Sequence, residues 1–184
     1  MASRPTLAYS RPGLILGSES PIPDDRSIAV RLHRLLAESP AEAAVNLGEY
    51  LPDVSTAIVA ALAEGCDIRL RFACDPRCLV SPERALSIGY AVVELVTNAV
   101  KYAHPTGVAG EIAVACSQGP DGTITVEVSD DGVGLPEGMD PMTADSLGLR
   151  LVRSMCTQLG GRVGFEDNML GLSCVLQMPG EVRA

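Results

Sequence analysis

The sequence has no tryptophan, only 3% aromatic residues and a single lysine, Lys101. It also lacks a basic patch, because its 13 arginines are spread along a chain of net charge −9. Nucleic-acid binding normally needs clustered lysine and arginine, so we expect no DNA or RNA partner. No apolar run approaches the ~20 residues that span a bilayer, and the N-terminus shows no basic-then-apolar leader pattern. We therefore expect a soluble cytoplasmic protein with no membrane segment.

The composition is that of a folded protein, with 47% hydrophobic and 20% charged residues in 184. A chain of this length buries a full core without disulfides or a structural metal. Of its six cysteines, Cys116 and Cys174 lie in apolar alternating runs, where cysteine acts as a small buried hydrophobe. Cys74 and Cys78 have the spacing of half a zinc site, but no second ligand pair follows. We expect reduced thiols.

The chain divides into three regions. Residues 1–23 are rich in proline, serine and glycine and predict a flexible arm. Residues 24–64 predict a helical segment, with apolar residues at helical spacing over about 24–39 and again over about 47–64. Residues 65–184 carry the remaining pattern and predict the main domain.

The main domain alternates between strand-like and helix-like spacing of its apolar residues. The patterns predict a strand over 67–73, a helix over 82–103, strands over 111–117 and 123–129, a helix over about 148–159, and strands near 162–167 and 172–178. The segment 130–148 contains glycines and predicts a loop. This order predicts an α/β fold, a two-layer sandwich with helices on one face of a mixed, mostly antiparallel sheet. The helical segment precedes it.

A polar stripe marks the helix predicted over 82–103. Glu94, Asn98 and Lys101 stand at i, i+4 and i+7, so they share one helix face. An amide oxygen is a hard ligand for Mg²⁺, and lysine is a point charge for phosphate. The stripe therefore suits a metal-bound phosphate, although by itself it equally describes the solvated face of an amphipathic helix.

Two further segments suit a nucleotide. Asp130 follows a strand and precedes Gly132 and Gly134, which allow a sharp turn and close approach of a ligand. A carboxylate there can accept a hydrogen bond from an exocyclic amine. Residues 146–149, Ser-Leu-Gly-Leu, open a helix whose N-terminal N–H groups favour phosphate. Taken singly, they also describe an ordinary turn and a capped helix.

Together the three segments resemble the N box and the two glycine boxes of the GHKL superfamily ATP-binding domain, over about residues 80–179. The resemblance implies the Bergerat-type sandwich. The phrase Glu-Leu-Val-Thr-Asn-Ala at 94–99, followed by Lys-Tyr-Ala-His-Pro at 101–105, most resembles the catalytic domain of HWE-type sensor histidine kinases. The short segment 135–146 would be the ATP lid.

The resemblance implies ATP and Mg²⁺ as cofactors and assigns roles to single residues. Glu94 would be the general base or would orient the attacking nucleophile. Asn98 would bind Mg²⁺, Lys101 would contact phosphate, and Asp130 would bind the adenine amine. The rest of the implied nucleotide site is Tyr102, which would line the pocket, Gly132 and Gly134, which would shape it, and the second glycine box, Ser146, Leu147, Gly148 and Leu149, with Gly148 and Leu149 beside the phosphates.

Departures from the family pattern leave alternatives open. The Gly-Gly-Thr usual before the last strand reads Leu-Gly-Leu at 170–172, and no phosphoacceptor motif is found. His33 lies 61 residues before Glu94, too close for the family's acceptor, and His104 is interpreted as a loop residue at the pocket rim. The acceptor histidine would then belong to a longer parent protein or to a partner protein, with a response regulator downstream, or it would not exist.

Two other functions remain in view. An anti-sigma-factor-type serine kinase also works without an acceptor histidine in its own chain. A phosphotransfer adaptor with a degenerate ATP site would act through protein contacts alone. The apolar stripe of the helical segment is consistent with a homodimer, and equally with packing on the ATP-binding domain.

Overall fold

A computed structural model describes residues 44–63, 67–104, 108–167 and 171–181. The predicted arm, the helix expected over about 24–39 and His33 therefore lie outside the described residues.

The described chain alternates helices and strands much as the periodicities predict. In order, its elements are β1 (Val45–Asn46), α2 (Leu47–Leu62), β2 (Ile68–Cys74), β3 (Leu79–Val80), α3 (Pro82–Asn98), the π-helix η1 (Ala99–Ala103), β4 (Gly110–Gln118), β5 (Ile124–Asp130), α4 (Leu147–Gln158), β6 (Arg162–Asp167) and β7 (Leu172–Met178). The antiparallel pair β1–β3 was not predicted, because two-residue strands are too short to show an alternation.

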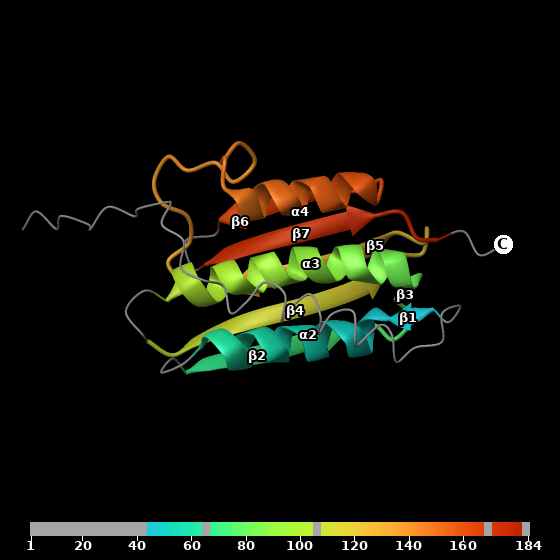
Figure 1. The fold of residues 1–184 in the computed structure, drawn as a ribbon, viewed down its shortest axis with the longest axis horizontal. Helices are drawn as coiled ribbons and strands as arrows, with labels where there is room; N and C mark the ends of the chain where they lie inside the picture. Colours follow the sequence, from blue (N-terminus) through green and yellow to red (C-terminus); the bar gives the residue numbers. More distant parts are fainter. Residues whose placement is uncertain (1–43, 64–66, 105–107, 168–170, 182–184) are drawn as a thin grey trace, which may run out of the picture.

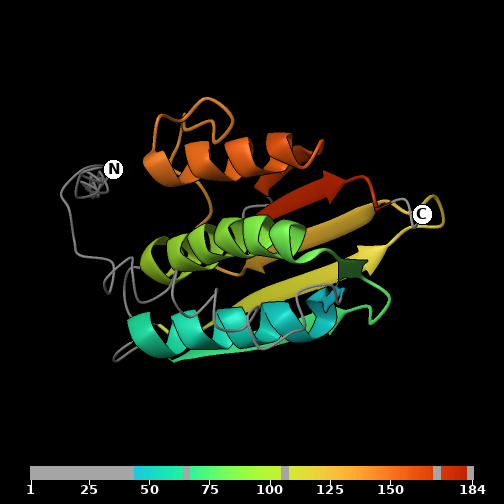
Figure 2. The ribbon, with the colours of Figure 1, turned by 45° about the vertical axis from the view of Figure 1, so that its right-hand side comes forward.

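Five strands form one mixed sheet in the order β2-β4-β5-β7-β6. The pair β2–β4 is parallel and the other three pairs are antiparallel, which confirms the mostly antiparallel prediction. Helices α2, α3 and α4 lie side by side in one layer over a single face of this sheet (Figure 1 and Figure 2). None of the described helices is long and apolar enough to cross a membrane.

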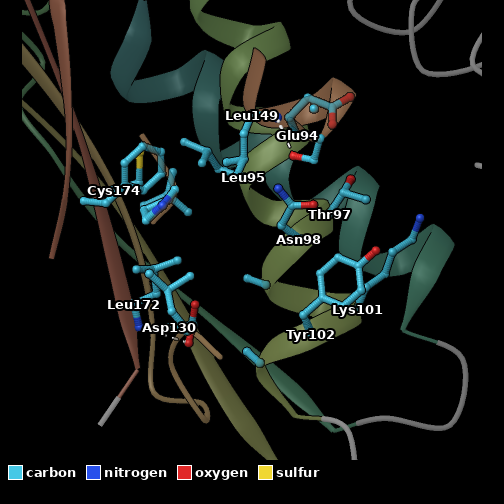
Figure 3. A pocket seen from close by; sticks show the side chains of 18 of the residues that line it. Glu94, Leu95, Thr97, Asn98, Lys101, Tyr102, Asp130, Leu149, Leu172 and Cys174 are labelled. Carbon is cyan, nitrogen blue, oxygen red and sulfur yellow. Dashed lines mark hydrogen bonds between the residues drawn. The ribbon is translucent and has the colours of Figure 1, made fainter. Parts of the chain in front are cut away.

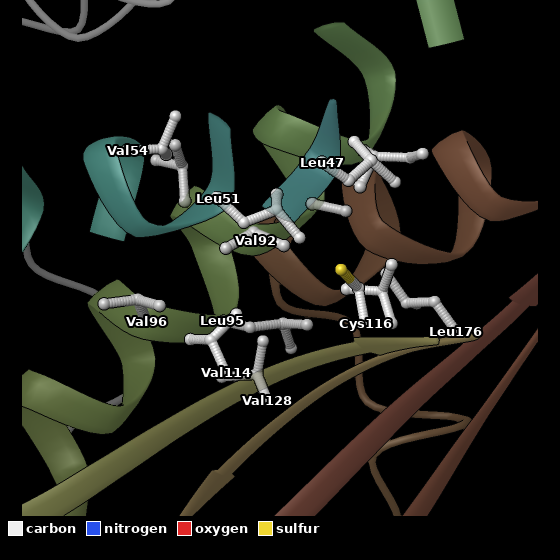
Figure 4. Close-up of a cluster of buried hydrophobic side chains, with 14 of the residues drawn as sticks. Leu47, Leu51, Val54, Val92, Leu95, Val96, Val114, Cys116, Val128 and Leu176 are labelled. Carbon is white, nitrogen blue, oxygen red and sulfur yellow. The ribbon is translucent and has the colours of Figure 1, made fainter. Parts of the chain in front are cut away.

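Helix α2 belongs to the same core as the sheet. Asn46 caps its start by accepting a hydrogen bond from the Gly48 amide at 2.9 Å. Leu47, Leu51 and Ile58 are fully or almost fully buried on the face that meets α3 and the strands. Figure 4 shows this face of α2 packed with α3 above side chains that rise from β4, β5 and β7.

The helix predicted over 82–103 is α-helical only to Asn98, and its last turn is the π-helix η1. Pro82 stands at its start, and the N-cap residue Ser81 forms no side-chain capping bond. At the other end the carbonyl of Ala103 accepts a hydrogen bond from Val133 at 2.9 Å. This contact comes from a segment thirty residues further along the chain, so helical periodicity carries no signal for it.

Candidate functional site

A cavity of about 280 Å³ lies between α3, the sheet and the start of α4. It brings together residues from all three sequence motifs. The predicted site residues that line it are Glu94, Asn98, Lys101, Tyr102, Asp130, Gly134, Ser146, Gly148 and Leu149. Gly132 and Leu147 do not line it.

The wall formed by α3 and η1 carries the polar stripe (Figure 3). Glu94 and Asn98 are half-buried on α3, whereas Lys101 and Tyr102 are exposed on η1. The π-helical turn changes the angular step between Asn98 and Lys101, so their alignment does not follow from α-helical spacing. All four side chains still line the cavity. The wall thus offers a carboxylate, an amide and a cation in series.

Asp130 lies across the cavity from this wall, at the end of β5 (Figure 3). Its Oδ1 accepts hydrogen bonds from the amides of Gly132 at 3.0 Å and Leu172 at 3.4 Å. Burial raises the pKa of this carboxyl, and the two amide donors partly offset that effect. Within the described residues, both of these hydrogen bonds go to Oδ1.

The first glycine box is packed against the end of η1. A Cβ at Gly132 would collide with the carbonyl oxygen and Cβ of Ala103, so only glycine fits. Gly134 has φ of +67°, a conformation that L side chains rarely adopt. Gly132 thus packs against Ala103, which lines the cavity, and does not line the cavity itself.

The second glycine box begins α4 directly beside Glu94. The hydroxyl of Ser146 accepts a hydrogen bond from the Leu149 amide at 3.4 Å and caps the helix. A Cβ at Gly148 would lie 2.5 Å from Glu94 Oε2, so α3 and α4 touch here through a glycine. Leu147 points away, with 82% of its surface exposed.

His104 is a loop residue, as predicted, but it does not line the cavity. Its side chain is only 8% exposed, and Nε2 lies 2.8 Å from Asp131 Oδ1. The same oxygen of Asp131 accepts the Glu111 amide at 2.7 Å, which lowers the pKa of Asp131 together with the His104 contact. Glycine at 110 leaves space for the imidazole ring. The contact between His104, the residue directly after η1, and Asp131 therefore links the end of this helix to the first glycine box.

The segment 135–146 passes over one side of the cavity and contributes Pro136, Met139 and Pro141 to the lining. Arg153 on α4 holds this segment: its guanidinium donates to the carbonyls of Pro141 at 2.7 Å and Ala144 at 2.8 Å. The segment thus has a defined position over the helix.

Sequence reasoning missed the apolar part of the lining. These residues are Leu95, Ala99, Ala103, Val128, Leu135, Phe165, Leu172 and Cys174, together with the partly polar Thr97. The alternation of apolar and polar residues along each strand predicts which strand positions face the helices. Which inward positions border an open cavity depends on how α3 and α4 are spaced, and no local pattern reports that.

Residues 83–180 match the model of the family described as histidine kinase-, DNA gyrase B-, and HSP90-like ATPase, and these residues contain all three motifs. The chain belongs to this ATPase family. The GHKL resemblance inferred from the motifs is thereby confirmed.

Relatives within this ATPase family include sensor kinases. The chain is 33% identical over 104 residues to sensor histidine kinase PdtaS of Mycobacterium tuberculosis, covering 55% of this chain and 21% of that protein. It is 30% identical over 135 residues to blue-light-activated histidine kinase 2 of Erythrobacter litoralis, covering 73% of this chain and 38% of that protein. The chain thus spans well under half the length of either relative.

A solved structure supports the same assignment at the level of the fold. The histidine kinase domain from the Erythrobacter litoralis EL346 blue-light activated histidine kinase superposes with a TM-score of 0.73 at 29% identity, over 83% of this chain and 73% of that one. The α/β sandwich with one mixed sheet is therefore that of histidine kinase catalytic domains.

Proposed function

We propose that this chain binds Mg-ATP in the cavity and transfers the γ-phosphoryl group to a histidine that is not evident in this sequence. It would then be the catalytic domain of a two-component sensor histidine kinase, with a response regulator as the final acceptor. The observation that carries the proposal is the convergence of three separate motifs on one cavity of about 280 Å³. The sensor-kinase relatives support the choice of reaction.

Adenine would be recognised by Asp130. Its Oδ1 is already occupied by two backbone amides, so Oδ2 would accept the exocyclic amine. The apolar lining from Val128, Leu172 and Cys174 would surround the base ring. A half-buried carboxylate with a raised pKa in a cavity is a common mark of a binding site.

The phosphates would lie between Lys101 and the start of α4, where the helix N-terminus favours negative charge. The donor set fits Mg²⁺, which usually keeps several waters and takes one or two protein oxygens plus substrate phosphates. The Asn98 amide oxygen would supply such a ligand. No cluster of three or more acidic, histidine or cysteine side chains suited to a metal occurs in the described part of the chain, so phosphate oxygens would complete the site.

Phosphoryl transfer needs positioning and charge neutralisation more than covalent chemistry from the protein. Glu94, half-buried beside Gly148, would orient the incoming imidazole or accept its proton. His104 does not suit the acceptor role, because its ring is almost buried and bonded to Asp131. The acceptor would thus be presented by another protein segment at the open side of the cavity.

The reaction is tested by supplying a histidine-kinase acceptor hairpin in trans with ATP labelled on the γ-phosphate. The proposal predicts transfer that is labile in acid and stable in base, and that falls at least ~100-fold in Glu94→Ala. Asp53→Asn on the exposed face of α2 is the matched control and should transfer normally.

Other outcomes favour the alternatives. Acid-stable label on a serine would indicate an anti-sigma-factor-type kinase. Absence of transfer together with absence of nucleotide binding would indicate an adaptor with a degenerate ATP site.

A further inference from the structure

Three thiols meet at the end of the sheet opposite the cavity. Cys74 is the last residue of β2, and its partner in register on parallel β4 is Cys116. The Cys116 thiol interacts with the thiols of Cys74 and Cys78, and the Cys74 thiol also donates a hydrogen bond to the Val114 carbonyl at 3.8 Å. Asp130, at the cavity, pairs with Ile112 of β4, four residues before Cys116 and so about 13 Å away along the strand.

The pair Cys74 and Cys116 has the placement that a disulfide needs. Neighbouring strands lie about 4.8 Å apart, and disulfides join Cα atoms roughly 4.4–6.8 Å apart. Partners in register point to the same face of a sheet, and Figure 4 shows the sulfur of Cys116 directed toward the helix layer. Cys74 is half-buried and reachable from solvent, whereas Cys116 is 2% exposed.

Two local features make Cys74 the more acidic thiol. The hydrogen bond from the Cys116 thiol lowers the pKa of Cys74, and the same bond raises the pKa of Cys116. Gly48, in the first turn of α2, lies so close that a Cβ there would be 3.7 Å from the Cys74 Cβ. The positive end of α2 therefore adds to the stabilisation of a Cys74 thiolate.

We propose that Cys74 and Cys116 form a peroxide-sensitive dithiol site, with Cys74 as the attacking sulfur and Cys116 as the resolving one. The Cys74 thiolate attacks one oxygen of hydrogen peroxide, the O–O bond breaks, and hydroxide leaves. Cys116 then attacks the resulting sulfenic acid: the S–S bond forms, the S–O bond breaks, and the Cys116 proton leaves with hydroxide as water. Two thiols are oxidised by two electrons, and one peroxide becomes two waters.

The link would join a residue inside the family match to one outside it. Cys116 lies within residues 83–180 that match the ATPase family, and Cys74 lies outside them. Oxidation would thus fix β2, and the start of α2 beside it, to the family's sheet without involving the nucleotide cavity.

The test is peptide mapping by mass spectrometry of the reduced full chain after treatment with hydrogen peroxide, without nucleotide. We expect a Cys74–Cys116 linked peptide in the unmodified chain and in Cys156→Ser, the control for a buried thiol whose pKa is raised by burial. The link should be lost in Cys74→Ser. A map of the unmodified chain that shows no link, or a link through Cys78, would overturn the proposal without requiring any variant to fold.

The pH dependence gives a second readout that a passive buried thiol would not share. The rate at which peroxide protects Cys74 from alkylation should rise with pH, with a midpoint below the ~8.5 of a free thiol. A midpoint at or above that value would contradict the role of Cys74 as the attacking sulfur. Both readouts are obtained without ATP, so their failure is separate from failure of the proposed kinase function.

Discussion

Asp130 places a carboxylate where burial disfavours its charge, and its pKa is raised for that reason. A raised folded-state pKa means that folding favours the protonated form. The contribution to stability is therefore largest at low pH and is lost as pH rises through the raised value. At neutral pH the charge costs stability, which is consistent with a side chain kept for a ligand.

Replacement Asp130→Asn separates the effect of the carboxylate on stability from its effect on nucleotide binding. The asparagine oxygen can still accept the Gly132 and Leu172 amides, while its NH₂ group would oppose the adenine amine. We expect the midpoint of thermal unfolding at pH 7 to be equal to or higher than that of the unmodified chain. Mg-ADP affinity should fall at least ~10-fold, the usual effect of losing a hydrogen bond to a charged group.

Unchanged nucleotide affinity in Asp130→Asn would contradict the adenine assignment. Asp53→Asn, which also removes one carboxylate but on the exposed face of α2, is the control for the change in net charge.

Asn98 is expected to act through the metal. Replacement Asn98→Ala should reduce Mg²⁺-dependent ADP affinity at least about tenfold, or about 1.4 kcal/mol, and leave binding in excess chelator unchanged. The measurement is a pair of calorimetric titrations, with Mg²⁺ and with chelator. Gln158→Ala removes an exposed amide from α4 and should keep the full Mg²⁺ effect. If Asn98→Ala also keeps it, the magnesium role is wrong.

At the scale of elements, the start of α4 packs against Glu94 at Gly148. Alanine at 148 would favour the helix by up to ~1 kcal/mol but would place a methyl group 2.5 Å from Glu94 Oε2. Because that oxygen is the end of a flexible side chain, Glu94 can move aside at little cost in stability. We expect Gly148→Ala to unfold at or above the normal temperature and to lose phosphotransfer.

Gly164→Ala in β6 is the matched control, since a Cβ there meets nothing within 4 Å. Equal phosphotransfer in Gly148→Ala and Gly164→Ala would show that phosphotransfer does not depend on the contact between α4 and Glu94.

The segment over the cavity is held to α4 by Arg153. Replacement Arg153→Ala removes two hydrogen bonds to the carbonyls of Pro141 and Ala144, each worth about 1 kcal/mol. We expect faster amide hydrogen exchange within residues 137–145 and weaker nucleotide binding. Arg150→Ala, which loses only an exposed ion pair with Asp145, should change neither. Identical exchange in the two variants would contradict the anchoring role of Arg153.

The elements that sequence predicted well are those specified locally. The helices α2 and α4 and the hairpin β4–β5 follow from apolar periodicity, the cap at Ser146 and the glycine turn after Gln118. The π-helix η1 and the buried position of His104 were not predictable in this way. Both depend on contacts with the first glycine box, thirty residues away, through Val133 and Asp131.

The candidate site was predictable in its polar residues and not in its shape. Motif spacing identified Asn98 and Asp130, which lie on opposite sides of one cavity (Figure 3). It also assigned Gly132 and Leu147 to the nucleotide site, and neither residue lines the cavity. A motif reports which residues recur together. It does not distinguish a glycine that touches the ligand from one that lets two backbones pack.

At the scale of the whole molecule, one hydrophobic cluster runs from α2 to β7. Leu51 of α2 is fully buried in it, so Leu51→Ala should lower the free energy of unfolding by about 2–5 kcal/mol. Leu62→Ala, at the half-buried end of the same helix, should cost less. The comparison is made by chemical denaturation. Equal losses would mean that α2 is not part of the cooperative core.

The shared core also bears on the predicted division at residues 64 and 65. A fragment of residues 65–184 keeps the whole family match but lacks α2. We expect it to lose cooperative unfolding, while a fragment of residues 44–184 keeps it. A cooperative transition in the shorter fragment would support a separate helical segment.

The proposed function requires nucleotide binding, and isothermal titration of Mg-ADP and a non-hydrolysable ATP analogue into the full chain tests that binding most directly. The absence of tryptophan makes intrinsic fluorescence a poor substitute. We predict saturable binding at one site per chain that weakens when Mg²⁺ is removed. Absence of binding at millimolar nucleotide would contradict the proposed kinase function and would favour an adaptor that acts through protein contacts.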